Sequence, residues 1–542
     1  MEILKVKDLS FTYPQCECHS VDRVSFEIES GELCVLCGAT GSGKSTLLKL
    51  LKKEISPIGE RTGQILFKGE DIETTEAYRI GFVMQHPEEQ IITDKVYSEL
   101  AFGLENMGLP QNVSARRVAE MASYFGIEDW YDREVSTLSG GQKQLLNLAS
   151  VMVMGPDILI LDEPTSQLDP IATSDFLGTL KKLNRDLSLT VIIAEHRLEE
   201  LIPVCDRLLV MDRGRLIENG APRQIVSRLN KDDPLLLSMP AAARLFHALD
   251  DAGECPLTVR EGRRYVEKTY SDRISSLQKN EYSHSEKKAI EFKDVYFRYE
   301  KNLPDVLKGL TFSVYEQEIF CILGGNGSGK TTALCCASGI RRAYSGSVRI
   351  FGRKIKEYKG QELYKNCLSL LPQDVQSVFL RNTVREELAD AGAKTEDLPF
   401  DLSSILDKHP YDISGGEQQL VALAKALATK PRILLMDEPT KGLDSAKKQA
   451  LISLLRKLKE DGMTLVIVTH DVEFAAECAD RCALFFRGDV VSVAPPHEFF
   501  SASSFYTTAI SRMTKGYFQN TVTVEDAACL CRKNGKRGQR EC

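Results

Sequence analysis

Short, continuous apolar runs alternate along this chain with longer stretches of helical periodicity. Two runs, DILILDEP at 157–164 and RILLMDEP at 432–439, end in carboxylates, and two more, TVIIAEH at 190–196 and TLVIVTH at 464–470, end in histidine. Continuous apolar runs are typical of strands buried on both faces, and their alternation with helices predicts a mostly parallel sheet and an α/β fold. The chemistry of such sheets lies at the carboxyl ends of the strands.

The whole pattern occurs twice, which predicts two domains of the same fold in one chain. Equivalent positions lie 286 to 288 residues apart up to a glutamine, and 274 or 275 residues apart from a serine onward. The second copy is therefore about a dozen residues shorter between these positions, as expected for a peripheral insertion on a common core. The matched pairs are Lys44 and Lys330, Gln85 and Gln373, Ser139 and Ser414, Asp162 and Asp437, and His196 and His470.

Each copy contains a G-x-x-x-x-G-K-[ST] motif between an apolar run and a helix-like stretch, the context in which this motif binds phosphate. Its glycines allow backbone N–H groups to wrap the phosphates of ATP, and its lysine adds a positive charge. The hydroxyl after the lysine, on Ser45 or Thr331, is suited to Mg²⁺. The first loop comprises Gly38, Ala39, Thr40, Gly41, Ser42, Gly43, Lys44, Ser45 and Thr46, and the second comprises Gly324, Gly325, Asn326, Gly327, Ser328, Gly329, Lys330, Thr331 and Thr332.

Carboxylates and histidines follow the buried strands in both copies. The first carboxylate is expected to hold Mg²⁺, and the second to orient or deprotonate an attacking water. The histidine ends a neighbouring strand, from which an imidazole can contact the γ-phosphate. These residues are Asp162, Glu163 and His196 in the first copy, and Asp437, Glu438 and His470 in the second.

Two further segments open helices 23 residues before the strand-end aspartate. Serine is a good N-cap, and the two glycines after it leave the helix amides bare. One such segment would be an ordinary helix start, but its recurrence at the same distance indicates a motif. The residues are Ser139, Gly140, Gly141 and Gln142 in the first copy, and Ser414, Gly415, Gly416 and Glu417 in the second.

With these motifs in this order, twice, the chain resembles a tandem ATP-binding-cassette (ABC) ATPase over roughly residues 1–225 and 289–500. The resemblance implies two domains, each a RecA-like P-loop core with an antiparallel β subdomain and a helical signature subdomain. It implies that the Gln-loop residues Gln85 and Gln373 contact Mg²⁺ and assist catalysis. It also implies that Tyr13 and Tyr299 stack on adenine, although a strand-end tyrosine also packs on its neighbours without a ligand.

The family pairs its domains head to tail, so each phosphate loop is expected to share ATP with the signature helix of the other half, as an internal pseudo-dimer. Asp loops are expected at 166–169 and 441–444. The chain departs from the family at Glu417, which replaces the usual glutamine, and at Leu145 and Leu420, where arginine is frequent. Both copies keep the catalytic glutamate and the switch histidine, so both are expected to hydrolyse ATP.

The predicted domains are a first ABC ATPase domain at 1–225, a linker with a helical segment at 226–288, a second ABC ATPase domain at 289–505, and a tail at 506–542. The polar stretch SDRISSLQKNEYSHSEKK within the linker is typical of an exposed connection. We expect the tail to be partly disordered. Its basic stretch, Arg532–Arg540, is expected to be solvated.

Composition limits the partners and the compartment. A net charge of −8 leaves no broad basic surface, so no nucleic acid is expected as a partner. No run of eighteen apolar residues is present to span a bilayer, and the first residues lack a signal-peptide core. The fifteen cysteines lie largely in apolar runs, which fits a reducing compartment. Cys16, Cys18 and His19 do not match a standard zinc spacing.

The sequence after the first Gln loop, 85–96 followed by SELAFGLENMGLP, is similar to the ATPases of energy-coupling-factor (ECF) importers of prokaryotes. The segments EHRLEEL at 195–201 and PLTVREGRR at 256–264 are also similar to fused ATPases of that group. This resemblance implies uptake of vitamins or transition-metal ions, powered by a peripheral protein at the cytoplasmic face of the cell membrane. The implied partners are a transmembrane scaffold (T-type) protein and a small substrate-capture membrane protein.

The alternative is a soluble tandem-cassette ATPase that acts on the ribosome in translation. Such proteins carry a long, strongly charged helical hairpin between the cassettes, with basic residues for RNA contact. The linker of this chain mixes charge signs and fits that role poorly.

Val375 stands where the first copy has Pro87, so we expect the two halves to couple unequally to a membrane partner.

Overall fold

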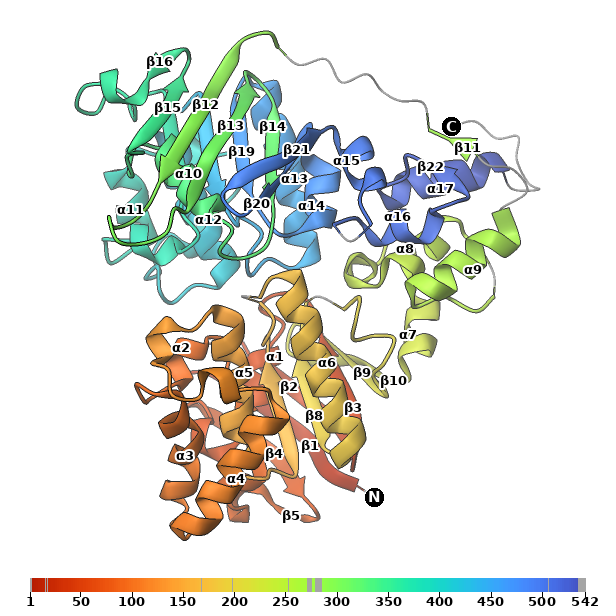
Figure 1. Ribbon diagram of the computed structural model, residues 1–542. Helices are drawn as coiled ribbons and strands as arrows, with labels where there is room; N and C mark the ends of the chain where they lie inside the picture. The colour runs from red at the N-terminus through yellow and green to blue at the C-terminus, as the bar shows by residue number, and fades with distance from the viewer. Residues whose placement is uncertain are drawn as a thin grey trace. The chain divides into compact units, whose positions relative to one another are not determined.

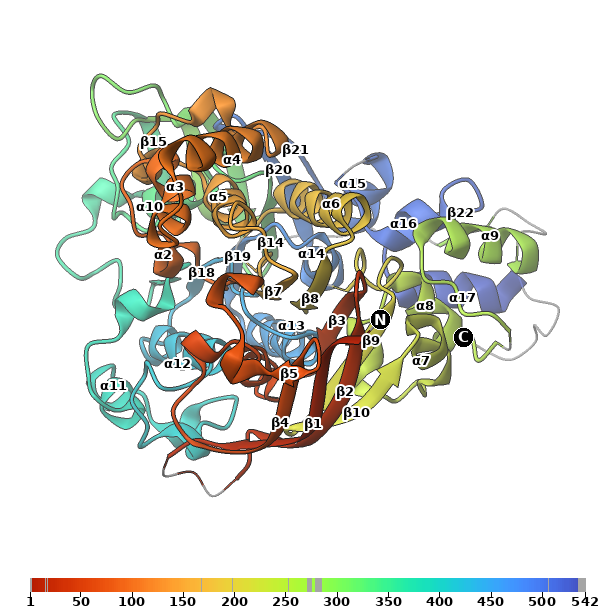
Figure 2. The same cartoon turned by 90° about the horizontal axis from the view of Figure 1, so that it is seen from below.

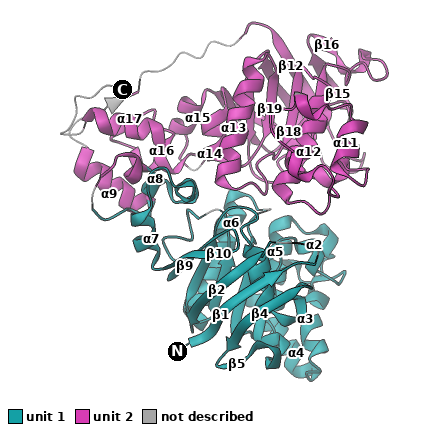
Figure 3. Cartoon of the chain, turned by 180° about the vertical axis from the view of Figure 1, so that it is seen from behind, with its two compact units in different colours: residues 1–244, 252–258 teal, residues 245–251, 259–542 magenta. Residues whose placement is uncertain are grey.

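The computed structural model describes residues 2–14, 16, 18–166, 168–196, 198–251, 253–270, 275–277, 285–504 and 506–534. The chain divides into two compact units, and each holds one copy of the repeat (Figure 3). Unit 1 comprises residues 1–244 and 252–258, and unit 2 comprises residues 245–251 and 259–542.

Unit 1 contains two sheets (Figure 1). The four-stranded antiparallel sheet has the order β2-β1-β4-β5, with β1 at Glu2–Thr12, β2 at Val21–Glu29, β4 at Glu60–Phe67 and β5 at Glu70–Asp71. The six-stranded sheet has the order β10-β9-β3-β8-β7-β6, in which β10 is antiparallel and the others are parallel. Its strands are β3 (Leu33–Cys37), β6 (Ile80–Val83), β7 (Ile158–Asp162), β8 (Thr190–Ala194), β9 (Arg207–Asp212) and β10 (Arg215–Gly220).

Helix α1, at Lys44–Leu50, contributes to the core that joins these two sheets. Phe11, Leu36, Leu48 and Ile160 are members of one buried cluster, so the antiparallel sheet, α1 and the parallel sheet share a core. Figure 2 shows β1, β2 and β4 side by side as the antiparallel layer. This packing fixes the loop between β3 and α1 at the carboxyl end of the parallel sheet.

The remaining helices of the first cassette lie after the strands that carry the motifs. A helical region follows β6 and ends in the signature helix, and α6 follows β7. The bounds are α2 (Pro87–Gln90), α3 (Val96–Asn106), α4 (Gln111–Tyr124), α5 (Gly140–Met152), α6 (Pro170–Leu187) and α7 (Pro222–Arg228).

Unit 2 repeats this topology. Its antiparallel sheet, in the order β13-β12-β15-β16, comprises β12 (Lys288–Phe297), β13 (Leu307–Tyr315), β15 (Ser345–Ile350) and β16 (Arg353–Lys354). Its six-stranded sheet, in the order β17-β18-β19-β14-β20-β21, comprises β14 (Ile319–Leu323), β17 (Leu368–Leu371), β18 (Ile433–Asp437), β19 (Thr464–Val468), β20 (Arg481–Phe486) and β21 (Asp489–Ala494). The helices are α10 (Lys330–Ala337), α11 (Val384–Asp390), α12 (Gly415–Ala428), α13 (Ser445–Glu460), α14 (Val472–Cys478) and α15 (Pro496–Ala502).

The two strand orders match element by element, so the predicted fold class, two tandem α/β cassettes with antiparallel and helical subdomains, is confirmed. The difference in length also has a location. The first copy places the 14-residue helix α4 between α3 and the signature helix, whereas the described residues of the second copy have short 3-10 turns at Thr395–Asp397 and Ser403–Ile405 there.

A small helical region accompanies the second cassette in unit 2. Helices α9 (Val259–Tyr270), α16 (Ala509–Thr514) and α17 (Val524–Asn534) lie side by side (Figures 1 and 2), and β11 (Ser275–Ser276) pairs in parallel with β22 (Phe518–Gln519). The division between the units passes through α8 (Ala241–Ala248). The described part of the predicted tail, 506–534, is therefore folded onto residues of the predicted linker. The four boundaries given above stay predictions.

Residues 535–540 of the predicted basic stretch lie outside the described residues, as does position 167 of the first Asp loop. Among the described residues, no helix combines the length and the apolar character needed to cross a bilayer.

Candidate functional site

The first phosphate loop joins β3 to α1. Gly38, Gly41 and Gly43 all have positive φ, at 145°, 80° and 97°, which side chains adopt only under strain. A Cβ on Gly38 would lie 2.1 Å from the carbonyl oxygen of Met211, so this position also lacks space. Lys44 is buried, and its Nζ donates to the carbonyl oxygens of Gly38 at 2.9 Å and Ala39 at 3.1 Å. The lysine side chain is thus bound by main-chain carbonyl groups of its own loop.

The strand-end aspartate of the first cassette contacts the hydroxyl that follows this lysine. Ser45 Oγ donates to Asp162 Oδ1 at 3.0 Å. Burial, reinforced by the neighbouring charge of Glu163, raises the pKa of Asp162 to about 6. A hydroxyl and a carboxylate at this distance are suited to bind Mg²⁺, and such a cation would relieve the repulsion between the acids.

Glu163 is the centre of a three-residue cluster. Gln85 Nε2 donates to Glu163 Oε2 at 3.0 Å, and His196 Nε2 lies 2.8 Å from Glu163 Oε1. Burial opposes the charge on Glu163, but the hydrogen bond and charge of His196 outweigh it and lower the pKa of this carboxyl. The glutamate adopts a positive φ of 45°, a strained backbone conformation that is typical of functional sites.

The second phosphate loop has the same construction. Gly324, Gly327 and Gly329 have positive φ, and Lys330 Nζ donates to the carbonyl oxygens of Gly324 and Gly325, both at 2.9 Å. Burial raises the pKa of Asp437 to about 6, against the hydrogen bond from the Thr331 hydroxyl.

The corresponding cluster of the second cassette is less complete. His470 Nδ1 lies 2.9 Å from Glu438 Oε2, and Glu438 has a positive φ of 51°. Gln373, in contrast, is exposed, and within the described residues it makes no hydrogen bond to Glu438. The structure therefore brings together all the predicted catalytic residues of the first cassette, and all but Gln373 of the second.

Both signature segments begin helices with a capping box. Ser139 Oγ accepts from Gln142 N at 3.3 Å, and Gln142 Oε1 accepts from Ser139 N at 3.0 Å. Ser414 and Glu417 make the same reciprocal pair. Glu417 can replace glutamine here because this role needs only an acceptor oxygen. Added Cβ atoms on Gly140 and Gly415 would meet no atom within 4 Å, whereas Gly141 and Gly416 have close neighbours.

The predicted adenine-stacking tyrosines also make contacts of their own. Tyr13 OH lies 3.2 Å from Thr46 Oγ1, and Tyr299 OH lies 3.0 Å from Thr332 Oγ1. The Arg341 guanidinium lies 5.5 Å from the ring centre of Tyr299, which is 51% exposed. Each tyrosine is thus tied to the helix that follows its phosphate loop, and its role toward adenine stays a prediction.

The residues present fit a nucleotide with Mg²⁺. The buried polar atoms of the described residues that have no hydrogen-bond partner include Ser42 Oγ, Ser328 Oγ and Asp437 Oδ1. Buried polar atoms are normally paired. These three belong to the two phosphate loops and to a strand end, where phosphate oxygens and a cation would supply the missing partners.

Two carboxylates that sequence analysis missed hold the segments after the Gln loops. Glu99 Oε2 accepts from the backbone N–H groups of Ile92 at 3.1 Å and Thr93 at 2.9 Å. The equivalent Glu387, which is fully buried, accepts from the N–H groups of Leu380 and Arg381 and pairs with Lys425. Their common spacing of 14 residues from Gln85 and Gln373 is the signal that could have identified them.

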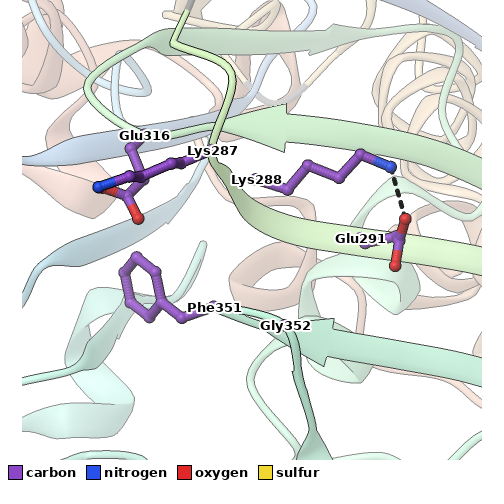
Figure 4. A pocket seen from close by; sticks show the side chains of 6 residues that line it. All are labelled: Lys287, Lys288, Glu291, Glu316, Phe351 and Gly352. Carbon is purple, nitrogen blue, oxygen red and sulfur yellow. Dashed lines mark hydrogen bonds and ion pairs between the residues drawn. The ribbon is translucent and has the colours of Figure 1, made fainter.

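One surface hollow of the second cassette lies away from the residues described above. Figure 4 shows a surface hollow of about 410 Å³ on the second cassette, lined by Lys287, Lys288, Glu291, Glu316, Phe351 and Gly352. Its carboxylates are paired, Glu291 with Lys288 at 2.5 Å and Glu316 with Arg432 at 3.6 Å. No disulfide joins the described cysteines, and no group of three or more His, Cys, Asp or Glu among the described residues could hold a metal ion.

We expect Asp437 to destabilise the nucleotide-free protein above about pH 6. Because its pKa is raised, the folded state binds this proton more tightly than the unfolded state between about pH 4 and pH 6, so stability falls as pH rises through that window. Asp437→Asn should therefore increase the free energy of unfolding by about 2 kcal/mol at pH 7.5 without Mg²⁺, and by almost nothing near pH 4. Urea denaturation at both pH values measures this difference.

Asp157 is the matched control. Burial raises its pKa, but hydrogen bonds and charges of Lys68 and Arg79 outweigh burial, so the pKa is lowered overall. Asp157→Asn should therefore destabilise the protein at pH 7.5, the opposite sign. A loss of stability in Asp437→Asn as well would contradict the electrostatic account.

Comparison with known proteins supports a single family. A family model described as ABC transporter matches residues 21–166 and again residues 307–441. A protein of Bacillus thuringiensis subsp. konkukian, which carries the provisional name ABC transporter ATP-binding protein, is 40% identical over 97% of this chain and 98% of its own length.

Two solved structures are also similar. The cbiO1 protein of Clostridium perfringens, part of the ABC transporter complex cbiONQ, is 34% identical, covers 42% of this chain and 91% of its own, and has a TM-score of 0.39. A chain from the complex of archaeal ribosomal stalk protein aP1 with archaeal ribosome recycling factor aABCE1 is 19% identical, covers 91% of both chains and has a TM-score of 0.59. The latter likeness is one of fold.

Proposed function

Because the chain belongs to the ATP-binding-cassette transporter family, we propose that it binds and hydrolyses ATP at two sites and thereby powers a membrane importer of the energy-coupling-factor type. The observation that carries the ATPase part is the contact of Glu163 with both Gln85 and His196, beside the phosphate loop and the Ser45–Asp162 pair. The same arrangement, without the Gln contact, recurs around Glu438.

Each cassette supplies the groups that such a reaction needs. The loop N–H groups and the lysine bind the phosphates, since Lys44 can exchange its two carbonyl contacts for phosphate oxygens. Mg²⁺, held by Ser45 and Asp162, would neutralise charge on the phosphates when bound. Glu163 accepts a proton from the attacking water or orients it, and His196 fixes that carboxylate.

We also propose that each ATP is shared between the cassettes. Ser414 and Gly416 would complete the site of Lys44, and Ser139 and Gly141 that of Lys330. The capped helix starts support this, because they present bare amides to an anion. Hydrolysis would remove the anion that both halves bind, which gives a ligand-dependent shift between closed and open states.

The importer part rests on the segments after the Gln loops. These segments expose large apolar side chains, Ile92 at 68% and Leu380 at 78%. Glu99 and Glu387 hold the backbone at both places, so each apolar group stands on a fixed loop. An exposed apolar side chain on a fixed loop suits a helix of a transmembrane scaffold (T-type) protein. The chain would then work peripherally at the cytoplasmic face of the membrane, with a small substrate-capture protein as further partner.

Copurification tests this proposal. A tagged chain, purified from detergent-solubilised membranes of its native host, should bring stoichiometric small multi-span membrane proteins with it. Ribosomal proteins in their place, with the chain absent from membranes, would favour the translation-factor alternative and leave the ATPase part intact.

Ile92→Asp combined with Leu380→Asp should reduce the copurified membrane protein at least about fivefold, because burial of a charge at a contact is costly. ATP hydrolysis by the purified chain should change by less than about twofold, since neither side chain contacts the catalytic cluster. The matched control is Ile58→Asp with Val491→Asp, at side chains that are 87% and 63% exposed in other parts of the chain. Equal losses in both pairs would contradict the assigned surface.

A further inference from the structure

In the first cassette, the residue before the switch histidine is a buried carboxylate that the proposed mechanism does not use. Glu195 is only 3% exposed. Its Oε1 accepts hydrogen bonds from Thr165 N at 2.9 Å and Thr165 Oγ1 at 2.6 Å, and its Oε2 accepts from His196 N at 3.1 Å. One side chain therefore ties the turn after Glu163 to the main chain of the histidine.

The second cassette is arranged differently at this position. Thr469 replaces the glutamate, and its hydroxyl accepts locally from Asp471 N at 3.0 Å. The main-chain N–H of His470 instead lies 3.4 Å from Glu438 Oε2, the same oxygen that lies 2.9 Å from His470 Nδ1. The catalytic carboxylate of this cassette thus serves both the side chain and the main chain of its histidine.

In the first cassette, Glu195 takes the place of the catalytic carboxylate as the acceptor for the main-chain N–H of the histidine. Because the main-chain N–H of His196 is occupied by Glu195, both oxygens of Glu163 are left for side chains, Oε1 for His196 and Oε2 for Gln85. In the second cassette, Gln373 is exposed and within the described residues makes no hydrogen bond to Glu438. The complete catalytic cluster therefore occurs where the extra carboxylate occurs.

We propose that Glu195 is a positioning residue of the first ATP site, which holds Glu163 in contact with both Gln85 and His196 and so makes the two sites hydrolyse ATP at unequal rates. This inference rests on the proposed ATPase function. It concerns a residue that touches neither phosphate nor water but acts through the main chain of the histidine and the turn at Thr165.

The buried environment of the Glu195 carboxyl is consistent with a role in positioning its neighbours. Burial raises the pKa of Glu195, the hydrogen bonds from Thr165 oppose the shift, and the charge of Glu163 adds to it. A second buried acid beside Glu163 lowers the stability of the fold. We therefore expect its contacts to serve the geometry of the site. Thr469 shows that the fold accommodates a small neutral side chain at this position.

First-turnover hydrolysis tests the proposal, with rapid quenching after the purified full chain is mixed with saturating MgATP. The native chain should show two phases, one for each site. Glu195→Gln, which is isosteric and keeps one oxygen for Thr165, should slow one phase about tenfold and leave the ATP concentration for half-saturation within about twofold. The slowed phase should be the one that Glu163→Gln removes. Thr469→Val, the matched change in the second cassette, should alter either phase by less than about twofold.

The other possible results contradict either the positioning role of Glu195 or ATP hydrolysis by the chain. A single phase in the native chain, equal slowing of both phases by Glu195→Gln, or no slowing would overturn the positioning role. A merely structural role would instead lower the melting temperature and weaken ATP binding together with the rate. A native chain that hydrolyses no ATP would refute the proposed function itself, which separates the two failures.

Discussion

Glu163→Gln together with Glu438→Gln should lower steady-state ATP hydrolysis about a thousandfold, the size of effect expected when a general base is removed. Gln keeps the size of the side chain and one acceptor oxygen, so the contacts with His196 and His470 can persist. ATP binding should therefore change by less than about threefold, which equilibrium binding of a fluorescent ATP analogue measures alongside phosphate release.

The single variants separate the two sites. Glu438→Gln alone should abolish first-turnover hydrolysis at one site and leave the other able to react. Glu70→Gln, an exposed carboxylate on β5, is the charge-matched control and should leave the rate unchanged within about twofold. If the double variant kept more than about a tenth of the native rate, the strand-end glutamates could not be the principal catalytic groups.

The parts of the site that could be predicted from sequence are those fixed by a short stretch of chain. The apolar runs within DILILDEP and RILLMDEP stop where β7 and β18 end, at Asp162 and Asp437. A strand buried on both faces leaves only its carboxyl end for polar groups, so the positions of the acids followed from the hydrophobic pattern. The serine N-caps and the glycine-rich loops could be predicted for the same reason, because short sequence motifs determine them.

What could not be predicted depends on contacts between distant segments. Glu163 and Glu438 combine a positive φ with hydrogen bonds to the neighbouring strands, since their N–H groups donate to the carbonyl oxygens of Ala194 and Val468 at 3.0 and 2.8 Å. The difference between Gln85 and Gln373 arises in the same way, because identical residues at equivalent positions have different surroundings. The helices of the predicted tail pack against α9, which lies more than two hundred residues earlier, so their order depends on a distant segment of the chain.

Gly38→Ala and Gly324→Ala should weaken ATP binding at least about a hundredfold, because the added methyl groups have no space. Their Cβ atoms would lie 2.1 Å from the carbonyl oxygen of Met211 and 2.4 Å from that of Phe485, whereas real Cβ contacts are essentially never below 3.0 Å. Both carbonyl groups belong to buried strands, β9 and β20, so the phosphate loop must move instead. A displacement on the order of 1 Å in a positioned loop is enough for such a loss.

Two glycines that also have positive φ, but have open space around them, serve as controls for the effect of the steric clash. Gly69 and Gly352 follow β4 and β15, have φ of 87° and 76°, and would place a Cβ with no atom within 4 Å. Gly69→Ala and Gly352→Ala should therefore cost only the left-handed strain, about 1 kcal/mol each, and leave ATP affinity unchanged. Calorimetric titration with ATP and thermal unfolding of the four variants give both quantities. Full ATP affinity in Gly38→Ala would show that the loop tolerates the displacement, and that the backbone N–H groups are not what binds the phosphates.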